Sequence, residues 1–360
     1  MGAHVPLESS QEFHAYTTQV RAVGRKPHPT QGGKRITLEW LESLEAWECL
    51  WHFRLMAEEL VDMVHALKIP DVFCTTSQYS FMAVEALCLL CAQFCSAGDL
   101  YILSVLYDRS QSSITECINE LVFYIDETWS YLLDCDQHHL LHPTQLAHHA
   151  ATIHARGSPL PSIFGFIDCT IHCICQPTCY QCQAHNGHKK FHALKFQAIM
   201  LPNGIIGHLF GPYEGYQNDV YLLSESHLLE RFSQFAFHEG APPNTPLEEC
   251  TLQIFGDPAY GIGPHIISPF SGAGERTKEE KEWNAQMLAI QIEVEHGFGI
   301  VANLWPFLNA GWKVHLYNSL VGQYYRVGVI LTNSINCLCS NQVSKYFNCL
   351  PPSLAEYFHN

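Results

Sequence analysis

Two apolar runs in the second half of the chain each end in an aspartate. The first run covers residues 163–167 and leads into Asp168, and the second covers 252–256 and leads into Asp257. Apolar runs of this length between turn signals are typical of buried strands. A carboxylate at the tip of a buried strand is costly unless a cation or a hydrogen-bond donor lies beside it. The pattern therefore predicts a sheet whose strand ends carry acidic side chains for a bound cation.

Two more carboxylates belong with this pair. Asp219 stands directly before residues 220–229, which have the composition of a helix, and Glu295 lies in a longer helical segment. Several carboxylates that converge form a cage of hard oxygen ligands suited to Mg²⁺ or Mn²⁺. Two such ions catalyse in-line displacement at phosphodiester bonds. We therefore expect one set of residues to be both catalytic and metal-binding, namely Asp168, Asp219, Asp257 and Glu295.

The composition is that of a folded protein without a membrane span. The 360 residues are 47% hydrophobic, enough for a large α/β domain and a smaller one. Neither a signal peptide nor a run of about 18 apolar residues is present, so we expect a soluble, intracellular protein. Without a secretory signal, the 16 cysteines are expected to be free thiols in a reducing compartment.

The charge balance opposes self-sufficient DNA binding. The formal net charge is −16, whereas DNA-binding proteins are usually basic. Residues 85–150 contain nine acidic residues and a single base, Arg109. Such a region repels phosphates. We therefore expect DNA to be engaged through other residues or through a basic partner.

The first half of the chain has the pattern of an arm followed by helices. Residues 1–36 are polar and are expected to form a flexible arm, and 37–150 are expected to be all-helical. Residues 95–125 contain two helical segments around a turn, with Ser110 as the N-cap of the second. This helix-turn-helix-like segment either reads DNA ends or belongs to a helical bundle, and the acidic charge favours the bundle. The histidine-rich residues 138–161 are predicted to be a connection.

From residue 162 the pattern becomes α/β. Strands are predicted at 163–168, 193–201, 204–210 and 251–256, and Pro202-Asn203 predicts a hairpin between the second and third. Thr277, with Glu280 three residues later, predicts the capped start of a helix that carries Glu295 and ends near 297–299. The fold class is therefore α/β, a mixed sheet with flanking helices over residues 162–340, followed by a C-terminal tail over 341–360.

A zinc site is an open alternative for part of this region. Soft ligands gather between residues 173 and 192, where Cys-x-Cys, Cys-x-x-Cys and His-x-x-His spacings follow one another. A cysteine-rich chain also places thiols near one another without a metal. The candidate ligands are Cys173, Cys175, Cys179, Cys182, His185 and His188.

Five motifs in order carry a family resemblance. They are Gly165-Phe166-Ile167-Asp168-Cys169-Thr170, Asn186-Gly187-His188-Lys189-Lys190-Phe191-His192-Ala193-Leu194-Lys195-Phe196-Gln197, Gly211-Pro212-Tyr213-Glu214-Gly215 with Asn218-Asp219, Gly256-Asp257-Pro258-Ala259-Tyr260, and Val294-Glu295-His296-Gly297-Phe298-Gly299. Together they resemble the PIF/Harbinger superfamily of DDE transposases, which includes Harbinger-derived nucleases. The resemblance covers about residues 162–340 closely and the preceding helical segment loosely.

The resemblance implies a ribonuclease-H-like catalytic domain that cleaves phosphodiester bonds at transposon ends as a metal-dependent DNA endonuclease and strand transferase. In that fold the first aspartate lies on the first strand, the second follows the fourth strand, and the glutamate lies on a late helix. Strand order favours Asp257 as the second aspartate, whereas the family motif also includes Asp219, so both stay in the site. The lysines expected to hold the DNA backbone near this site are Lys189, Lys190 and Lys195.

The resemblance also implies partners, and the sequence departs from it in three places. DNA, a Myb-like DNA-binding protein that also supplies nuclear entry, and a second copy of the chain are the expected partners, and the nucleus is the expected location. Cys169 replaces a glycine beside the first aspartate, His172 stands where a basic residue is frequent, and Gln291 stands where arginine is common. The intact carboxylates favour the enzyme, whereas Gln291 and the acidic helical region favour a second interpretation, a domesticated and catalytically silent relative that acts as a DNA, chromatin or protein-interaction factor.

Overall fold

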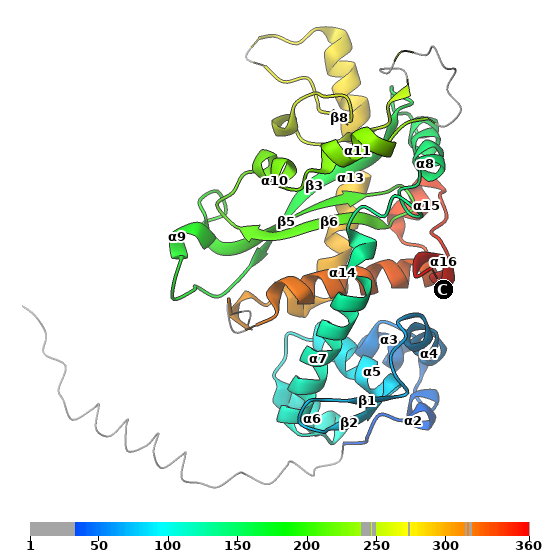
Figure 1. Cartoon of the computed structure of the whole chain (residues 1–360), viewed down its shortest axis with the longest axis vertical. Helices are drawn as coiled ribbons and strands as arrows, with labels where there is room; N and C mark the ends of the chain where they lie inside the picture. The colour runs from blue at the N-terminus through cyan, green and yellow to red at the C-terminus, as the bar shows by residue number, and fades with distance from the viewer. Residues whose placement is uncertain are drawn as a thin grey trace, which may run out of the picture.

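The computed structural model describes residues 33–238, 246, 250–272, 274–313, 315–316 and 319–359. Figure 1 shows a helical region at one end and a sheet with its helices at the other, with the helix α14 (Val321–Leu338) between them. The arm predicted over residues 1–36 lies almost wholly outside the described residues. Among the described helices, none is long and apolar enough to cross a membrane.

The N-terminal region is helical, as predicted, with one small exception. Residues 38–66 form three helices, and Arg54 takes a left-handed conformation (φ 63°) that ends the second. A short antiparallel hairpin, β1 (Val72–Cys74) and β2 (Ser80–Met82), interrupts the helices. The Ser110 side chain accepts a hydrogen bond from the Ser113 amide, which confirms the predicted N-cap. The helices are α2 (Leu38–Glu42), α3 (Ala46–Phe53), α4 (Ala57–Ala66), α5 (Ala83–Cys95), α6 (Leu100–Tyr107) and α7 (Gln111–Trp129).

A six-stranded mixed sheet forms the second region, and it confirms the predicted fold class. Its order is β4-β5-β3-β7-β8, and β6 also pairs with β5. The β3–β5 and β5–β6 pairs are antiparallel, whereas β3–β7 and β7–β8 are parallel, an arrangement consistent with a ribonuclease-H-like fold. The strands are β3 (Ile163–Cys173), β4 (His185–Asn186), β5 (Phe191–Met200), β6 (Ile206–Glu214), β7 (Gln253–Phe255) and β8 (Ile266–Ile267).

Helices cover both faces of the sheet and differ from the sequence pattern in several places. The connection predicted over 138–161 contains a helix, and the helix predicted over 220–229 is divided at His227, which takes a left-handed conformation (φ 50°). Residues 341–359, within the predicted C-terminal tail, contain two helices, and Tyr357 and Phe358 are buried. The helices are α8 (Pro143–Ala155), α9 (Gln181–Ala184), α10 (Asp219–Glu225), α11 (Leu228–Phe235), α13 (Lys278–Leu304), α14 (Val321–Leu338), α15 (Gln342–Phe347) and α16 (Leu354–Tyr357).

The long helix α13 starts where predicted but ends later. Thr277 and Glu280 form the expected capping box. The helix then continues through Gly297 to Leu304 instead of ending near 297–299. A Cβ at Gly297 would lie 2.8 Å from the Cε atom of Met200. The glycine therefore allows close packing of helix on sheet and does not end the helix.

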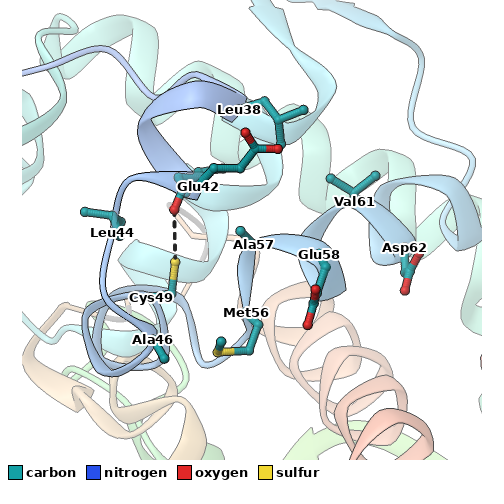
Figure 2. Close-up of a pocket in the computed structure, with 11 residues that line it drawn as sticks. Leu38, Glu42, Leu44, Ala46, Cys49, Met56, Ala57, Glu58, Val61 and Asp62 are labelled. Atoms are coloured by element: carbon teal, nitrogen blue, oxygen red, sulfur yellow. Dashed lines mark hydrogen bonds between the residues drawn. The ribbon is translucent and has the colours of Figure 1, made fainter.

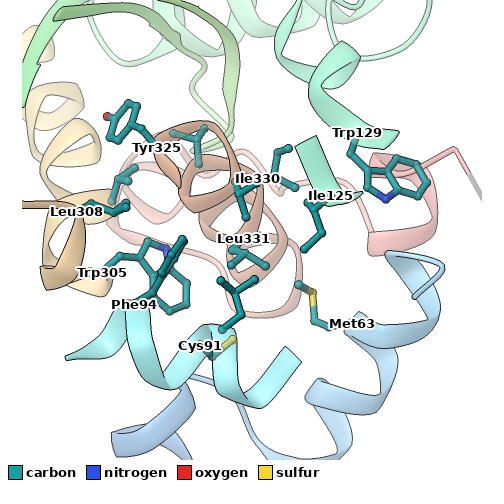
Figure 3. Close-up of a cluster of buried hydrophobic side chains, with 14 of the residues drawn as sticks. Met63, Cys91, Phe94, Ile125, Trp129, Trp305, Leu308, Tyr325, Ile330 and Leu331 are labelled. Carbon is teal, nitrogen blue, oxygen red and sulfur yellow. The ribbon is translucent and has the colours of Figure 1, made fainter. Parts of the chain in front are cut away.

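The hydrophobic core continues from the sheet into the N-terminal helices. One cluster combines Phe94 of α5 with Trp305, at the end of α13, and with the inner face of α14 (Figure 3). The Trp305 indole donates to Thr332 Oγ1 at 2.9 Å, and Phe94 packs edge-on against its ring. Arg326 of α14 forms an ion pair with Asp126 of α7. The two regions are therefore packed together through a shared interior.

Candidate functional site

Asp168 and Asp257 occupy equivalent positions at the ends of neighbouring parallel strands. Phe166 of β3 pairs in register with Phe255 of β7, and each aspartate lies two residues beyond its phenylalanine. Adjacent strands run about 4.8 Å apart. Side chains along a strand alternate between the two faces of a sheet, so residues two apart share a face. The local backbone therefore brings these two carboxylates to one edge of the sheet.

The shared face is the one that α13 covers. Phe166 and Phe255 belong to the core cluster on this side, and the Phe255 ring lies 6.0 Å from the ring of Trp283 in α13. The Gln291 amide, one turn before position 295, donates to Asp257 Oδ1 at 3.5 Å. Glu295 lies on α13, but its side chain is outside the part that the structure describes. The helix thus runs past the two strand ends as the predicted site requires.

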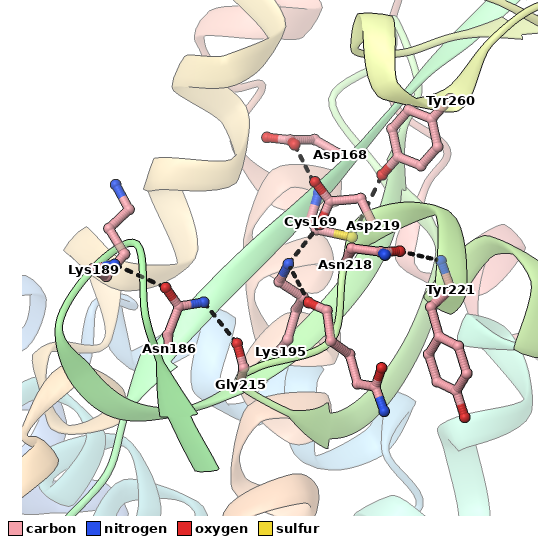
Figure 4. Close-up of polar contacts among 11 residues, drawn as sticks. Asp168, Cys169, Asn186, Lys189, Lys195, Gly215, Asn218, Asp219, Tyr221 and Tyr260 are labelled. Atoms are coloured by element: carbon pink, nitrogen blue, oxygen red, sulfur yellow. Dashed lines mark hydrogen bonds and ion pairs between the residues drawn. The ribbon is translucent and has the colours of Figure 1, made fainter. Parts of the chain in front are cut away.

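Asp219 lies on the other face of the sheet. Its Oδ1 atom is 2.6 Å from the Lys195 ammonium, which also donates to the Gln217 carbonyl at 2.9 Å (Figure 4). Lys195 projects from β5 beside Gln197, whose amide donates to Ser226, between α10 and α11. Only 6% of Lys195 is exposed. The buried Lys195 ammonium is therefore paired with a partly exposed Asp219 carboxylate, and the alternation of the strand separates this pair from Asp168.

Cys169 and Tyr260 complete this second face. The Cys169 thiol lies 3.4 Å from the Tyr260 hydroxyl. Burial raises the pKa of Cys169, and the negative charge of Asp219 raises it further. Burial likewise raises the pKa of Tyr260 well above its ordinary value. Both groups are therefore neutral near pH 7, and Cys169 is no thiolate nucleophile. Tyr260 was absent from the predicted site, although its place in the motif that begins at Gly256 could have indicated it.

Lys189 and Lys190 have a different environment from Lys195. Both are exposed and lie in the turn between β4 and β5. The buried Asn186 side chain shapes this turn by accepting from the Lys189 amide at 2.8 Å and donating to the Gly215 carbonyl at 2.6 Å. Asp168 pairs across the sheet with Ala198, eight residues beyond Lys190. At about 3.4 Å per residue, the turn lies roughly 27 Å along the strand from the aspartate.

His172, at the position where a basic residue is frequent, is buried in an aromatic group. Its ring centroid lies 3.9 Å from that of Tyr325. Burial lowers the pKa of His172 to about 4, so the imidazole is neutral at pH 7. The side chain packs in the core, and it does not offer a cation to DNA.

The donor set on the α13 face fits a divalent cation as far as it is described. Asp168 and Asp257 supply hard oxygen ligands, and the metals implied for this fold, Mg²⁺ and Mn²⁺, prefer such ligands. Within the described side chains, no three His, Cys, Asp or Glu residues gather closely enough to hold a metal. The same holds for the cysteine- and histidine-rich residues 173–192, where the Cys175 thiol lies 3.6 Å from His315 Nε2.

Removal of the Asp219 carboxylate should destabilise the protein. We expect Asp219→Ala to lower the free energy of unfolding by about 3 kcal/mol, because a buried ammonium loses its counter-ion. Urea denaturation at pH 7 measures the change. The double variant Asp219→Ala/Lys195→Met is the control, and it should recover much of the loss because no buried charge remains. A loss no larger than that of an exposed ion pair would contradict the burial of the Lys195 ammonium.

Part of the chain is similar to a known family of endonucleases. No curated protein and no solved structure matches the chain. Residues 167–333 match the family model described as DDE superfamily endonuclease. The match contains Asp168, Asp219, Asp257 and Glu295. Taken with the mixed sheet and the two aspartates at its strand ends, it supports a DDE transposase-like nuclease domain in this part of the chain.

Proposed function

We propose that this chain is a metal-dependent DNA endonuclease or strand transferase of the DDE transposase type. The observation that carries the proposal is the placement of Asp168 and Asp257 at equivalent ends of parallel strands, on the face covered by α13. The match to the DDE superfamily endonucleases gives independent support. The proposal also includes cleavage at transposon ends and membership of the PIF/Harbinger superfamily.

Three carboxylates would hold the metal in this proposal. They are Asp168, Asp257 and Glu295, and a bound Mg²⁺ or Mn²⁺ would supply activation of a nucleophile and stabilisation of charge on phosphate oxygens. The Gln291 amide, which donates to Asp257, orients that carboxylate. Asp219 has a positioning role, because it holds Lys195 and the end of the Gln217 loop against the sheet.

A cleavage assay tests the function directly. Full-length protein is incubated with supercoiled and with linear duplex DNA in Mg²⁺, in Mn²⁺ and in EDTA. We expect nicking or cutting that requires the metal and is lost in Asp168→Asn. Asp71→Asn is the matched control, because Asp71 is exposed and lies outside the sheet region. Absence of any metal-dependent cleavage, in the presence of measurable DNA binding, would contradict the enzyme proposal.

The exposed turn provides a prediction about DNA binding. We expect Lys189→Gln/Lys190→Gln to weaken duplex binding and to reduce the slope of log K against log salt by about two, since each phosphate contact releases about one counterion. Fluorescence anisotropy over a range of salt concentrations measures both quantities. Lys345→Gln, an exposed lysine on α15, is the control. An unchanged salt slope would place the DNA elsewhere.

A second candidate function rests on Gln291. This buried amide contacts Asp257 where the family resemblance implies a frequent arginine, so the site has lost one positive charge. A catalytically silent factor that binds DNA, chromatin or another protein would keep the fold without the reaction. Binding without cleavage in the assay above would favour it. Location in the nucleus, with entry through a Myb-like partner, and self-association are proposals common to both functions.

A further inference from the structure

A groove lies among the first three helices, far from the sheet. One face each of α2, α3 and α4 encloses a hollow of about 540 Å³ (Figure 2). Apolar side chains form its walls, and three carboxylates, Glu42, Glu58 and Asp62, stand among them. No lysine or arginine is among the residues that line it. The apolar lining residues are Leu38, Leu41, Leu44, Ala46, Cys49, Met56, Ala57 and Val61.

The apolar surface continues from the groove around α3. Trp47 and Trp51 are 67% and 69% exposed, and Leu50 is 42% exposed. At about 100° per residue, Leu50 lies on the helix between the groove face and the face with the two indoles. Exposed tryptophans four residues apart are uncommon on a surface that stays in water, and such rings often anchor protein interfaces.

The charge of the region around this surface is predominantly negative. Residues 37–150 contain 17 acidic residues and three bases, Arg54, Lys68 and Arg109. The Arg54 guanidinium donates to the Leu304 carbonyl, Lys68 lies over the Trp129 ring, and Arg109 pairs with the buried Glu85. All three bases are thus engaged within the fold. Among the described residues, Glu42, Glu58 and Asp62 have no ion-pair partner.

We propose that this groove and the adjoining Trp47–Trp51 face form a docking surface for a basic, amphipathic helix of another protein. An apolar stripe on such a helix would fill the hollow, as in other helix-in-groove complexes. Its lysines and arginines would face Glu42, Glu58 and Asp62 at the rim. The proposal does not depend on the nuclease function, because no residue of the sheet takes part.

Charge selects this occupant over two others. DNA is disfavoured, because the groove presents carboxylates and Arg54, Lys68 and Arg109 are engaged in the fold. A second copy of the chain would bring one acidic surface against another, and like charges across an interface suppress association. A basic partner is attracted for the same reason, and its binding should weaken as salt rises.

A designed peptide tests the surface without knowledge of the natural partner. The probe is a fluorescein-labelled helix of about 14 leucines and lysines, about 21 Å long, with the leucines on one face. We expect it to bind the full chain at low salt at least tenfold more tightly than two controls. One control has the same composition in scrambled order, and the other has glutamate in place of lysine.

Three variants assign the binding to the groove. Glu58→Lys/Asp62→Lys should weaken peptide binding at least tenfold, and Val61→Arg should do so by blocking the hollow. Glu127→Lys, an exposed glutamate on α7, is the control for charge and should leave affinity unchanged. These changes lie at the surface, so melting temperatures are expected to stay the same. If the double variant Glu58→Lys/Asp62→Lys melts at a lower temperature, Trp51→Ser is used in its place. Trp51 lies outside the groove walls, and its replacement should also weaken peptide binding.

Four results would overturn the proposal. The scrambled or acidic peptide could bind as tightly as the probe, or the groove variants could bind the probe normally. Sedimentation could show a dimer that Val61→Arg dissociates, which would make a second copy the occupant. Finally, removal of residues 1–32 could strengthen peptide binding, which would make the chain's own N-terminal segment the occupant.

Discussion

Asp257→Asn should abolish DNA cleavage while Asp219→Asn should leave a folded, partly active protein. Asp257 lies beside Asp168 on the α13 face, whereas Asp219 is on the opposite face in an ion pair with Lys195. Loss of one preorganised charge-stabilising group in an active site typically costs about 10²–10³-fold in rate. We therefore expect at least that loss for Asp257→Asn, and less than about tenfold for Asp219→Asn at a temperature where it stays folded.

A metal-binding measurement distinguishes the roles of Asp257 and Asp219 independently of catalytic activity. Titration calorimetry with Mn²⁺ should show binding that Asp168→Asn and Asp257→Asn remove and Asp219→Asn retains. Asp71→Asn again serves as the control. If Asp219→Asn removed metal binding while Asp257→Asn retained it, the assignment of the second aspartate would be reversed.

Mild acid should unfold this protein. Burial lowers the pKa of His149 to about 3 and that of His172 and of His208 to about 4, against an ordinary value of 6.5. Between these values the unfolded chain binds protons that the folded chain excludes, so stability falls as pH falls below about 6.5. Each histidine should contribute a loss of about 2 kcal/mol between pH 7 and pH 5, and the three together about 5–6 kcal/mol.

Urea denaturation at the two pH values measures this loss, and single variants assign it. His172→Phe keeps a ring against Tyr325 but cannot take up a proton, so it should reduce the loss by about 2 kcal/mol. His138→Gln replaces an exposed histidine and should leave the loss unchanged. Equal stability of the unmodified chain at pH 5 and pH 7 would show that these histidines are accessible to protons in the folded state.

Local signals predicted the elements whose ends are determined locally. Helices α6 and α7 are the two helical segments expected around a turn within residues 95–125, and Ser110 and Thr277 cap the helices they were expected to cap. The hairpin at Pro202-Asn203 likewise joins two paired strands. These signals act within a few residues, through side-chain hydrogen bonds to the backbone and through turn preferences.

Features that depend on distant contacts were predicted less well. Gly297 was predicted to lie near a helix end, but it lies inside the helix and packs closely against Met200, almost a hundred residues earlier in the chain. The two-faced arrangement of Asp168 and Asp219 depends on which strand face α10 covers, and no local pattern encodes that choice. The burial of Lys195 was not predicted, for the same reason: its exposure depends on the helices that cover the sheet. Whether Glu295 joins the pair of aspartates remains a prediction.

The hydrophobic interior shared by the helical region and the sheet affects how such a chain can evolve. Phe94, Trp305 and α14 tie the two regions together, so damage to either one weakens both. A descendant that used only the helical groove would still need the sheet to stay folded. Selection for binding alone would then preserve most of the nuclease framework. In this architecture an intact framework is therefore weak evidence for catalysis, and the state of the carboxylates at the two strand ends, Asp168 and Asp257, is the more direct record of it.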